Sequence, residues 1–253
     1  MGGGDIGESW RVRAAGEELF VKRYAGPDGD AMVVAEARGL AWLRDAAAIR
    51  VPEVRDAGDG WLVLGWIESG TPTDTTEEAL GRGLAALHRA GAPGFGFEED
   101  NFLGRLPQVN DPAPTWAAFY RDRRLAPLLA RVGLEGRGEA LLARLDDLVG
   151  PDEPPSRLHG DLWGGNWMCD SGGEPVLIDP AVYGGHREVD LAMMRLFGGF
   201  GERVFAAYRE AHPLAPGHEK RVDLYQLYPL LVHLALFGEG YRASVERTIA
   251  AYV

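Results

Sequence analysis

Apolar and polar positions in the first third of the chain follow two patterns, one typical of strands and one of a helix. The runs ELFVKRY and WLVLGWI, residues 18–24 and 61–67, are short and β-prone, so each predicts a strand. Residues 30–48 carry a stripe at helical spacing, with Asp30 as the expected N-cap. The stripe consists of Met32, Glu36, Leu40, Leu43 and Ala47.

Glu36 is the one charged member of this stripe. A buried carboxylate without a partner costs on the order of several kcal/mol, so it must meet a cation or stay protonated. Lys22, fourteen residues earlier, is the obvious cation. Alternatively, Glu36 lies at the edge of the stripe and its carboxylate reaches water.

Farther along the chain the apolar spacing becomes helical. Residues 75–91 predict a helix in which Thr75 and Glu78 have capping-box spacing and Gly91 marks the end. Residues 136–150 predict a second amphipathic helix, which ends before the proline-rich PDEPP.

The apolar stretch 222–237 predicts a further helix, which Pro229 is expected to bend or divide. Strands with one helix therefore come first, and helices dominate the rest. We expect an α+β protein whose first lobe covers residues 1–67 and whose second covers residues 68–253.

The ten residues LHGDLWGGNW, 158–167, fit neither a helix nor a strand, because three glycines disfavour the first and Asp and Asn the second. The following run PVLIDP predicts a buried strand that delivers Asp179 at its end. Asn166 lies five residues after Asp161, and Asp179 lies eighteen after it. This order and spacing are typical of a protein-kinase-like catalytic loop and the metal-binding strand end that follows it.

Phosphoryl transfer explains these residue types. Asp161 can accept the proton of an attacking hydroxyl, and Asn166 and Asp179 offer the hard oxygen ligands that Mg²⁺ prefers. Gly164 and Gly165 permit a tight turn between base and metal ligand. The constellation therefore predicts an active site.

The upstream elements fit the same chemistry. Lys22 and Glu36 are predicted to hold ATP phosphates, as the strand lysine and helix glutamate of kinases do. The connector Gly65, Trp66 and Ile67 is predicted to present backbone groups to adenine. Gly4 belongs to a G-x-G-x-x-G match, which is a weak signal because no strand precedes it in this sequence.

Composition excludes several other classes of protein. With 46% hydrophobic and 25% charged residues the chain is an ordinary globular one, and its net charge of −12 argues against a nucleic-acid partner. Cys169 is the single cysteine, so no internal disulfide is possible and a reducing, cytoplasmic location is expected. No apolar stretch is long enough to predict a membrane span.

Several blocks resemble, in order, those of the fructosamine kinase or ketosamine-3-kinase family, a branch of the aminoglycoside-phosphotransferase and choline-kinase superfamily. Among them are FVKRY, AEARGLAWL, LGRGLAALHR, HGDLWGGNW and IDPAVYGGHREVDLAM. The resemblance covers nearly the whole chain. It implies a two-lobed protein-kinase-like fold, with a small β-rich N-lobe that holds one long helix and a larger, mainly helical C-lobe.

The resemblance also implies an activity. Such enzymes move the γ-phosphate of ATP, with Mg²⁺, to the 3-hydroxyl of a ketosamine, the adduct of a sugar with a free amine or a protein lysine. The phosphorylated product decomposes and releases the amine, which amounts to deglycation. By position, the resemblance gives the roles named above to Lys22, Glu36, Asp161, Asn166 and Asp179.

Four further residues near the loop are candidates for substrate contact or support. Trp163 is expected to pack against the sugar and Trp167 to lie in the core. His186 and Glu188 are candidates for the border of the acceptor cleft, although charged loop residues are usually only solvated.

Four other polar residues are expected to have structural roles. His159 is interpreted as a hydrogen-bonding residue and not as a proton carrier. Asp190 either caps the following helix or braces the catalytic loop. His88 and His233 lie on apolar helices and are interpreted as core histidines.

Two departures from the family pattern leave other functions open. The family's usual strand before GGGDI is missing from this sequence, and Gly7 and Gly65 stand where larger polar residues are expected. One alternative is a kinase for another hydroxyl acceptor, such as an aminoglycoside or an amino alcohol. The other is a nucleotide-binding pseudokinase without catalysis.

Overall fold

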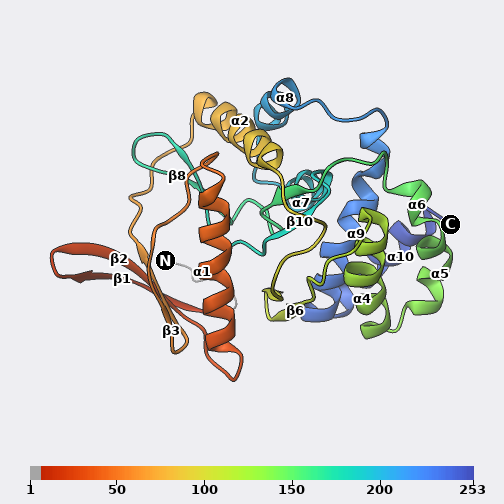
Figure 1. Ribbon diagram of the computed structural model, residues 1–253, viewed down its shortest axis with the longest axis horizontal. Helices are drawn as coiled ribbons and strands as arrows, with labels where there is room; N and C mark the ends of the chain where they lie inside the picture. Colours follow the sequence, from red (N-terminus) through yellow and green to blue (C-terminus); the bar gives the residue numbers. More distant parts are fainter. Residues whose placement is uncertain (1–6) are drawn as a thin grey trace.

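The computed structural model describes residues 7–253, so Gly4 lies outside the described residues. Four antiparallel strands form a sheet in the order β1-β2-β4-β3 (Figure 1). Two tight hairpins join them, and Ala15, Gly16, Asp59 and Gly60 all have the positive φ that such turns require. The strands are β1 Glu8–Ala14, β2 Glu17–Arg23, β3 Val54–Gly58 and β4 Trp61–Gly65.

Helix α1, Gly29–Asp45, packs beside this sheet and confirms the predicted helix. Its buried residues include Met32, Glu36, Leu40 and Leu43, so Glu36 lies in the buried stripe and not at its edge. The helix begins before Asp30, which lies in its first turn, so the predicted N-cap was wrong. The Asp30 carboxylate accepts instead from the backbone N–H of Gly60 in the β3–β4 hairpin.

The remaining chain is mainly helical. Its helices are α2 Asp74–Ala90, α3 Trp116–Phe119, η1 Tyr120–Leu125, α4 Ala126–Arg131, α5 Glu135–Ala143, α6 Leu145–Leu148, α7 Glu188–Phe197, α8 Glu202–Ala211, α9 His218–Phe237, η2 Glu239–Tyr241 and α10 Arg242–Ala250. Three short ribbons pair β5 Asn101–Leu103 with β6 Leu106–Gln108, β7 Ser156–Leu158 with β10 Tyr183–Gly185, and β8 Trp167–Cys169 with β9 Pro175–Leu177. This arrangement confirms the expected α+β, two-lobed fold.

Two predicted helix details were wrong. The capping box of α2 is formed by Thr73 and Thr76, because Thr73 already adopts the extended N-cap conformation, whereas Thr75 lies inside the helix. The predicted helix 136–150 is interrupted at Arg144, whose φ of −107° and ψ of 5° leave the helical region. Of the two outcomes expected at Pro229, division of the helix is ruled out, because α9 runs continuously through this residue.

Two hydrophobic cores hold the molecule together. One lies within the helical part, around α9 and the segment from α3 to α4. The other joins Val33 and Leu40 of α1 and Leu62 of β4 to Leu84 of α2 and Val204 of α8. Because this second core crosses the connector after β4, sheet and helices form a continuous structure, and the lobe boundary at residue 67 stays a prediction.

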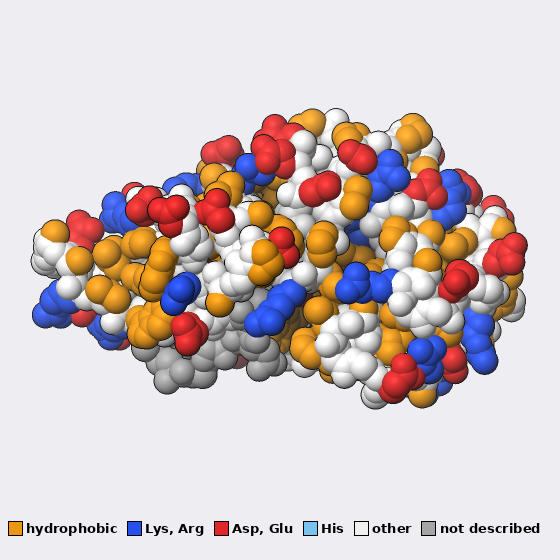
Figure 2. All heavy atoms as spheres, turned by 90° about the horizontal axis from the view of Figure 1, so that it is seen from below, with side chains coloured by type: hydrophobic (Ala, Val, Ile, Leu, Met, Phe, Trp, Pro, Cys, Tyr) orange, Lys and Arg blue, Asp and Glu red, His pale blue; other side chains and the backbone are white. Residues whose placement is uncertain are grey.

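The sheet forms the narrower end of the molecule (Figure 2). Hydrophobic side chains are exposed on it among charged ones, including Trp10, Val12 and Trp61. Among residues 7–253, none of the helices has the length and apolar character needed to cross a membrane.

Candidate active site

The loop from His159 to Asn166 connects β7 to β8 and is fixed by its own histidine. The His159 Nε2–H donates to the Ile178 carbonyl at 2.9 Å, and the Nδ1 accepts from the Asp161 backbone N–H at 3.3 Å. Both ring nitrogens thus have hydrogen-bond partners, one inside the loop and one at Ile178, directly after β9. Burial lowers the pKa of His159, so the ring is neutral. This geometry favours the structural interpretation of His159.

Asp190, in the first turn of α7, braces the same loop. Its carboxylate accepts from the backbone N–H groups of His159 at 2.8 Å and Gly160 at 2.9 Å. Gly160 has a φ of +82°, and a Cβ there would lie 2.0 Å from the Ala181 carbonyl oxygen. The position requires glycine for both reasons, and the bracing interpretation of Asp190 holds.

His88 of α2 and Tyr208 of α8 complete this support. The His88 Nε2 lies 3.2 Å from the Asp190 carboxylate, and its Nδ1 lies 2.8 Å from the Tyr208 hydroxyl. All three side chains are buried, so His88 is the satisfied core histidine that was expected. Burial alone would raise the pKa of Asp190. The hydrogen bonds to its carboxylate and the neighbouring histidines lower this pKa instead.

Asn166 links the two aspartates that the sequence spacing singled out. Its Nδ2 donates to the Asp161 carboxylate at 3.1 Å, to the Asp161 carbonyl at 2.8 Å and to the Asp179 carbonyl at 3.4 Å. The Ile178 N–H donates back to the Asn166 carbonyl at 3.0 Å. The three residues predicted from spacing therefore meet at one place.

Asp161 and Asp179 have unusual surroundings. Burial, with the nearby charge of Asp179, raises the pKa of Asp161 to about 7. Asp179 follows β9 with a φ of +52°, a left-handed conformation that is uncommon for residues other than glycine. Backbone strain of this kind concentrates at functional sites, where the surrounding structure enforces it.

Lys22 of β2 bridges the sheet to Asp179. Its Nζ lies 3.1 Å from the Glu36 carboxylate and 3.0 Å from the Asp179 carboxylate. Burial by itself lowers the pKa of Lys22, but these two carboxylates raise it above its usual value, so the ammonium stays charged. The predicted pairing of Glu36 with Lys22 is confirmed. The same ammonium contacts Asp179, whose side chain is 42% exposed.

Tyr24 is a site residue that the sequence reasoning missed. Its hydroxyl donates to the Glu36 carboxylate at 2.6 Å, and its ring lies 4.8 Å from the Lys22 ammonium. The signal was available, because residues two apart on a strand share a face and Tyr24 follows Lys22 at that spacing. Asp190 was singled out beforehand, but Tyr208, which reaches it only through His88, carried no such signal.

In the connector predicted to receive adenine, residues 65–67, two of the three backbone N–H groups already donate to other parts of the chain. The Gly65 N–H donates to the Glu53 carbonyl at 2.8 Å, and the Trp66 N–H donates to the Glu18 carbonyl at 3.2 Å. For Ile67, no backbone partner is found within residues 7–253. A contact with adenine would therefore use Ile67 or the connector carbonyls.

The remaining predicted residues divide between the loop and the interior. Trp163 is 41% exposed, and a Cβ on Gly165 would collide with its ring, so the indole folds over the glycine turn. Trp167 is half-buried and packs against the second core, where it stacks on Phe200. His186 and Glu188 are both buried, and Glu188 pairs with Arg221 at 2.6 Å.

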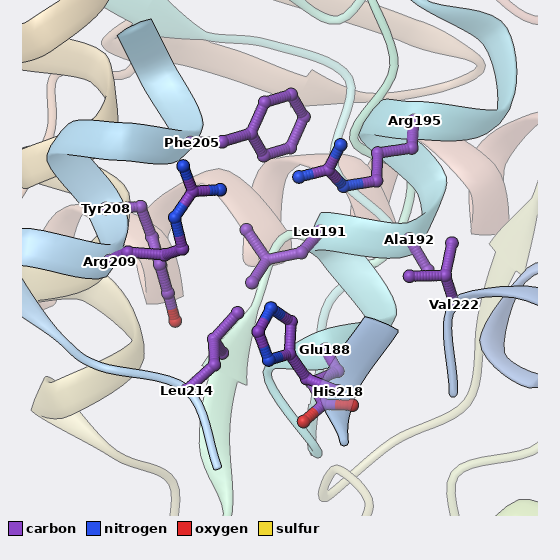
Figure 3. Close-up of a pocket in the computed structure, with 10 residues that line it drawn as sticks. All are labelled: Glu188, Leu191, Ala192, Arg195, Phe205, Tyr208, Arg209, Leu214, His218 and Val222. Carbon is purple, nitrogen blue, oxygen red and sulfur yellow. The ribbon is translucent and has the colours of Figure 1, made fainter. Parts of the chain in front are cut away.

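Glu188 also lines a small cavity between α7, α8 and α9 (Figure 3). Arg195 and Arg209 point towards one another there, near Phe205 and Leu191. The cavity volume of about 20 Å³ leaves room for roughly one water molecule. The cavity is therefore too small to be an acceptor site.

The donor atoms beside Asp161 suit a magnesium ion. Asn166 uses its amide nitrogen for hydrogen bonds, which leaves its Oδ1 available, and Asp179 offers a second hard oxygen. Within residues 7–253 no three His, Cys, Asp or Glu side chains gather as a metal site. Such a two-ligand set fits Mg²⁺, which usually keeps waters and substrate phosphates in its remaining positions.

Sheet, helix α1 and these polar groups together define the class of protein: the chain has a protein-kinase-like fold. The crystal structure of choline kinase LicA from Streptococcus pneumoniae matches 99% of this chain and 91% of its own, with a TM-score of 0.67 at 16% identity, a likeness in fold alone.

The chain belongs to the fructosamine kinase family, whose model matches residues 1–253. Protein-ribulosamine 3-kinase, chloroplastic, from Arabidopsis thaliana is 38% identical over 100% of this chain and 81% of its own length. The crystal structure of a candidate fructosamine-3-kinase from Thermobifida fusca is 42% identical and has a TM-score of 0.91. The match covers 100% of this chain and 91% of that one. The predicted family is confirmed.

Proposed function

We propose that this protein is an ATP-dependent ketosamine kinase, which transfers the γ-phosphate of ATP to the 3-hydroxyl of a fructosamine or ribulosamine adduct. Family membership over the whole chain supports this activity. The polar groups around Asp161 support it independently, because each has a place in phosphoryl transfer.

Asp161 is the proposed base. The acceptor hydroxyl donates its proton to the carboxylate as its oxygen forms a bond to the γ-phosphorus, and the bond from that phosphorus to ADP breaks. A base with a pKa near 7 matches the working pH, which favours proton transfer in the transition state. The Asn166 amide, at 3.1 Å, orients this carboxylate.

Lys22 and Glu36 are the proposed phosphate clamp. The Lys22 ammonium is held by the buried Glu36 carboxylate and directed to the side of the site where Asp179 lies. Tyr24 steadies Glu36 through its 2.6 Å hydrogen bond. An ammonium fixed in this way can neutralise phosphate charge without reorganising during the reaction. We propose further that the connector from Gly65 to Ile67 receives the adenine.

Asn166 Oδ1 and the Asp179 carboxylate would hold Mg²⁺. When bound, the ion supplies positive charge that neutralises the phosphate oxygens and orients them for in-line transfer. The Lys22 contact to Asp179 keeps that carboxylate in position.

Trp163 is the proposed sugar contact, because its exposed indole lies beside the base and offers a flat apolar face. His186 and Glu188 do not enter this proposal, since both side chains are buried. We propose that the acceptor is a free or lysine-borne adduct in the cytoplasm, whose 3-phosphate decomposes and releases the amine.

One observation carries the proposal: the Asn166 side-chain amide bonds to both Asp161 and Asp179, eighteen residues apart, at the position that Lys22 reaches from the sheet. A scaffold protein has no need for this convergence of a base, a metal-ligand pair and a buried ammonium.

Turnover of ATP with Mg²⁺ and a synthetic fructosamine or ribulosamine tests the function, with the product phosphate located by NMR. We expect phosphate on the 3-oxygen. Asp161→Asn should lower kcat by roughly 10²- to 10⁴-fold and leave nucleotide binding intact. Asp152→Asn, a surface substitution, is the control.

Two outcomes would contradict the proposal. Transfer to an aminoglycoside or an amino alcohol, with none to either ketosamine, would reassign the acceptor. Nucleotide binding without transfer to any acceptor would favour a pseudokinase.

A further inference from the structure

Four aromatic side chains form a partly exposed cluster where α7, α9 and η2 end. We call Phe197, His233, Phe237 and Tyr241 the aromatic ledge. The His233 ring centroid lies 4.5 Å from that of Phe197, 5.3 Å from Phe237 and 5.1 Å from Tyr241. Phe197 is 39% and Phe237 53% exposed. Large apolar groups that gather at the surface often mark a binding site.

The aromatic ledge adjoins the catalytic loop. Directly after Phe197 the chain turns at Gly198 and Gly199, where a Cβ built on Gly164 would lie only 2.9 Å from the Gly199 Cα. On its other side, the Trp167 Nε1–H donates to the Gly199 carbonyl at 3.3 Å. The segment that follows Phe197 of the ledge therefore packs directly on the glycine turn of the catalytic loop.

Helix α9 connects the ledge to the base. Tyr228 of α9 lies close enough to Asp161 for that charge to contribute, after burial, to the raised pKa of its hydroxyl. His233 comes five residues later, about 7.5 Å along a helix and about 140° around it, so its side chain lies on a different face from that of Tyr228. The ledge therefore lies about one and a half helical turns from the part of α9 that is nearest the base.

His233 gives the ledge a hydrogen-bond acceptor. Its Nδ1 lies 2.8 Å from the Pro229 carbonyl, which can only accept, so the Nδ1 carries the hydrogen. Burial lowers the pKa of His233, and the ring is neutral at neutral pH. The Nε2 lone pair has no hydrogen-bond partner within residues 7–253.

This chemistry fits an alkylammonium group. Aromatic ring faces attract cations, and methylene groups pack on the same faces. An unprotonated imidazole nitrogen accepts a hydrogen bond from an ammonium N–H. A ketosamine carries such a group a few bonds from its 3-hydroxyl: a secondary ammonium bearing the carbon chain of the parent amine.

We propose that the aromatic ledge binds the amine-derived part of the ketosamine, with its alkyl chain on Phe197 and Phe237 and its ammonium facing His233. This inference rests on the proposed function and narrows its substrate class. The preferred acceptors are adducts of long aliphatic amines, of which a lysine side chain is one.

Two fructosamines that differ only in the amine test the aromatic ledge. We expect the wild-type protein to have a kcat/KM for the n-butylamine adduct about tenfold above that for the methylamine adduct, mainly through KM. Phe237→Ala should reduce this ratio to about twofold or less. His233→Phe should weaken binding of both adducts, and His233→Gln, which restores an acceptor, should recover part of the loss.

Trp10→Ala is the matched control, because Trp10 is 40% exposed on β1, outside the ledge and the catalytic loop. This variant should keep the wild-type ratio. Titration calorimetry with the same adducts, without nucleotide, gives a second readout that needs no turnover, and far-UV circular dichroism detects a variant that fails to fold.

The outcomes separate the two proposals. If the wild-type protein phosphorylates both adducts but Phe237→Ala leaves their ratio unchanged, the ledge is overturned and the kinase activity stands. If neither adduct is phosphorylated, the proposed function fails. Calorimetry then still tests the proposal that the aromatic ledge binds the amine-derived part, and that proposal is overturned if both adducts bind equally well.

Discussion

The Asp161 carboxylate lies in surroundings that favour its protonated form. It is partly buried, the charge of Asp179 is close, and the Asn166 amide is the one side chain that donates to it within residues 7–253. The ionised form of Asp161, which the reaction uses, is thus unfavourable in the folded protein. Such a loss of stability at a residue needed for activity is common. The pH dependence of folding stability should reveal this loss.

Asp161→Asn should stabilise the protein by an amount that depends on pH. The pKa of Asp161 is raised from 3.8 to about 7 on folding, so the stability from its neutral form is present below pH 3.8 and lost as pH rises through 7. The variant, always neutral, should gain little at pH 4 and roughly 1–3 kcal/mol at pH 8, a value reduced for partial exposure. Urea unfolding from pH 4 to 8 measures the difference, with Asp152→Asn as the control; a pH-independent gain would refute the shift.

Helices α2 and α8 pack closely because α2 has a glycine, Gly81, where the two helices touch. A Cβ on Gly81 would lie 2.2 Å from the Val204 carbonyl oxygen and 2.9 Å from the Ala207 Cβ. This contact positions His88 on α2 and Tyr208 on α8 to reach each other at 2.8 Å, and through them Asp190 is held. The helix crossing therefore supports the catalytic loop from behind.

Gly81→Ala should destabilise the protein by roughly 1–3 kcal/mol, because the added methyl group forces the two helices apart. Gly136→Ala is the matched control, since Gly136 lies in α5 and a Cβ there has no neighbour within 4 Å among the described residues. That substitution should stabilise by roughly 0.5–1 kcal/mol. Thermal unfolding of both variants tests the packing, and equal effects would argue against it.

Elements with a strong local pattern could be predicted from the sequence, whereas their ends could not. The strand with Lys22, the strand before Asp179 and the helix with Glu36 follow from periodicity, and the Asp161–Asn166 interval from motif spacing. The cap of α2 was misplaced because four neighbouring residues, Thr73 to Thr76, are all plausible caps. Pro229 was expected to bend or divide α9, and it does not divide the helix, because packing on buried neighbours outweighs the lost hydrogen bond.

Contacts between distant segments were beyond the sequence. Nothing local indicates that Tyr208 lies against His88, or that Phe197 and His233 meet at 4.5 Å. The burial of His186 and Glu188 was missed for the same reason, since polar residues around the start of a helix suggest exposure until a partner such as Arg221 is known.

At the scale of the whole molecule, sheet and helices are joined both by packing and by charge. The second core runs from α1 and β4 to α2 and α8, and Lys22 contacts Asp179 across the same junction. Arg50 adds a backbone bridge to Val176 of β9 and an ion pair with Asp170. Ligands that bind at this junction should therefore stabilise the entire chain.

A non-hydrolysable ATP analogue with Mg²⁺ should raise the Tm of the wild-type protein, by a stabilisation of about 2.7 kcal/mol at a hundredfold excess over Kd. Asp179→Asn should lose most of this gain, because a metal ligand loses its charge. Scanning calorimetry with Mg²⁺ or with EDTA measures the effect, and Asp152→Asn should behave as wild type. A gain that survives both EDTA and Asp179→Asn would rule out Asp179 as a metal ligand.

The left-handed backbone at Asp179 has a consequence for anyone who improves this protein by mutagenesis. Glycine would relieve about 1 kcal/mol of conformational cost there, but it would also remove the carboxylate that pairs with Lys22 at 3.0 Å. A melting temperature alone would therefore not reveal what a substitution at this codon does to the site, and every clone altered there needs a parallel assay of turnover.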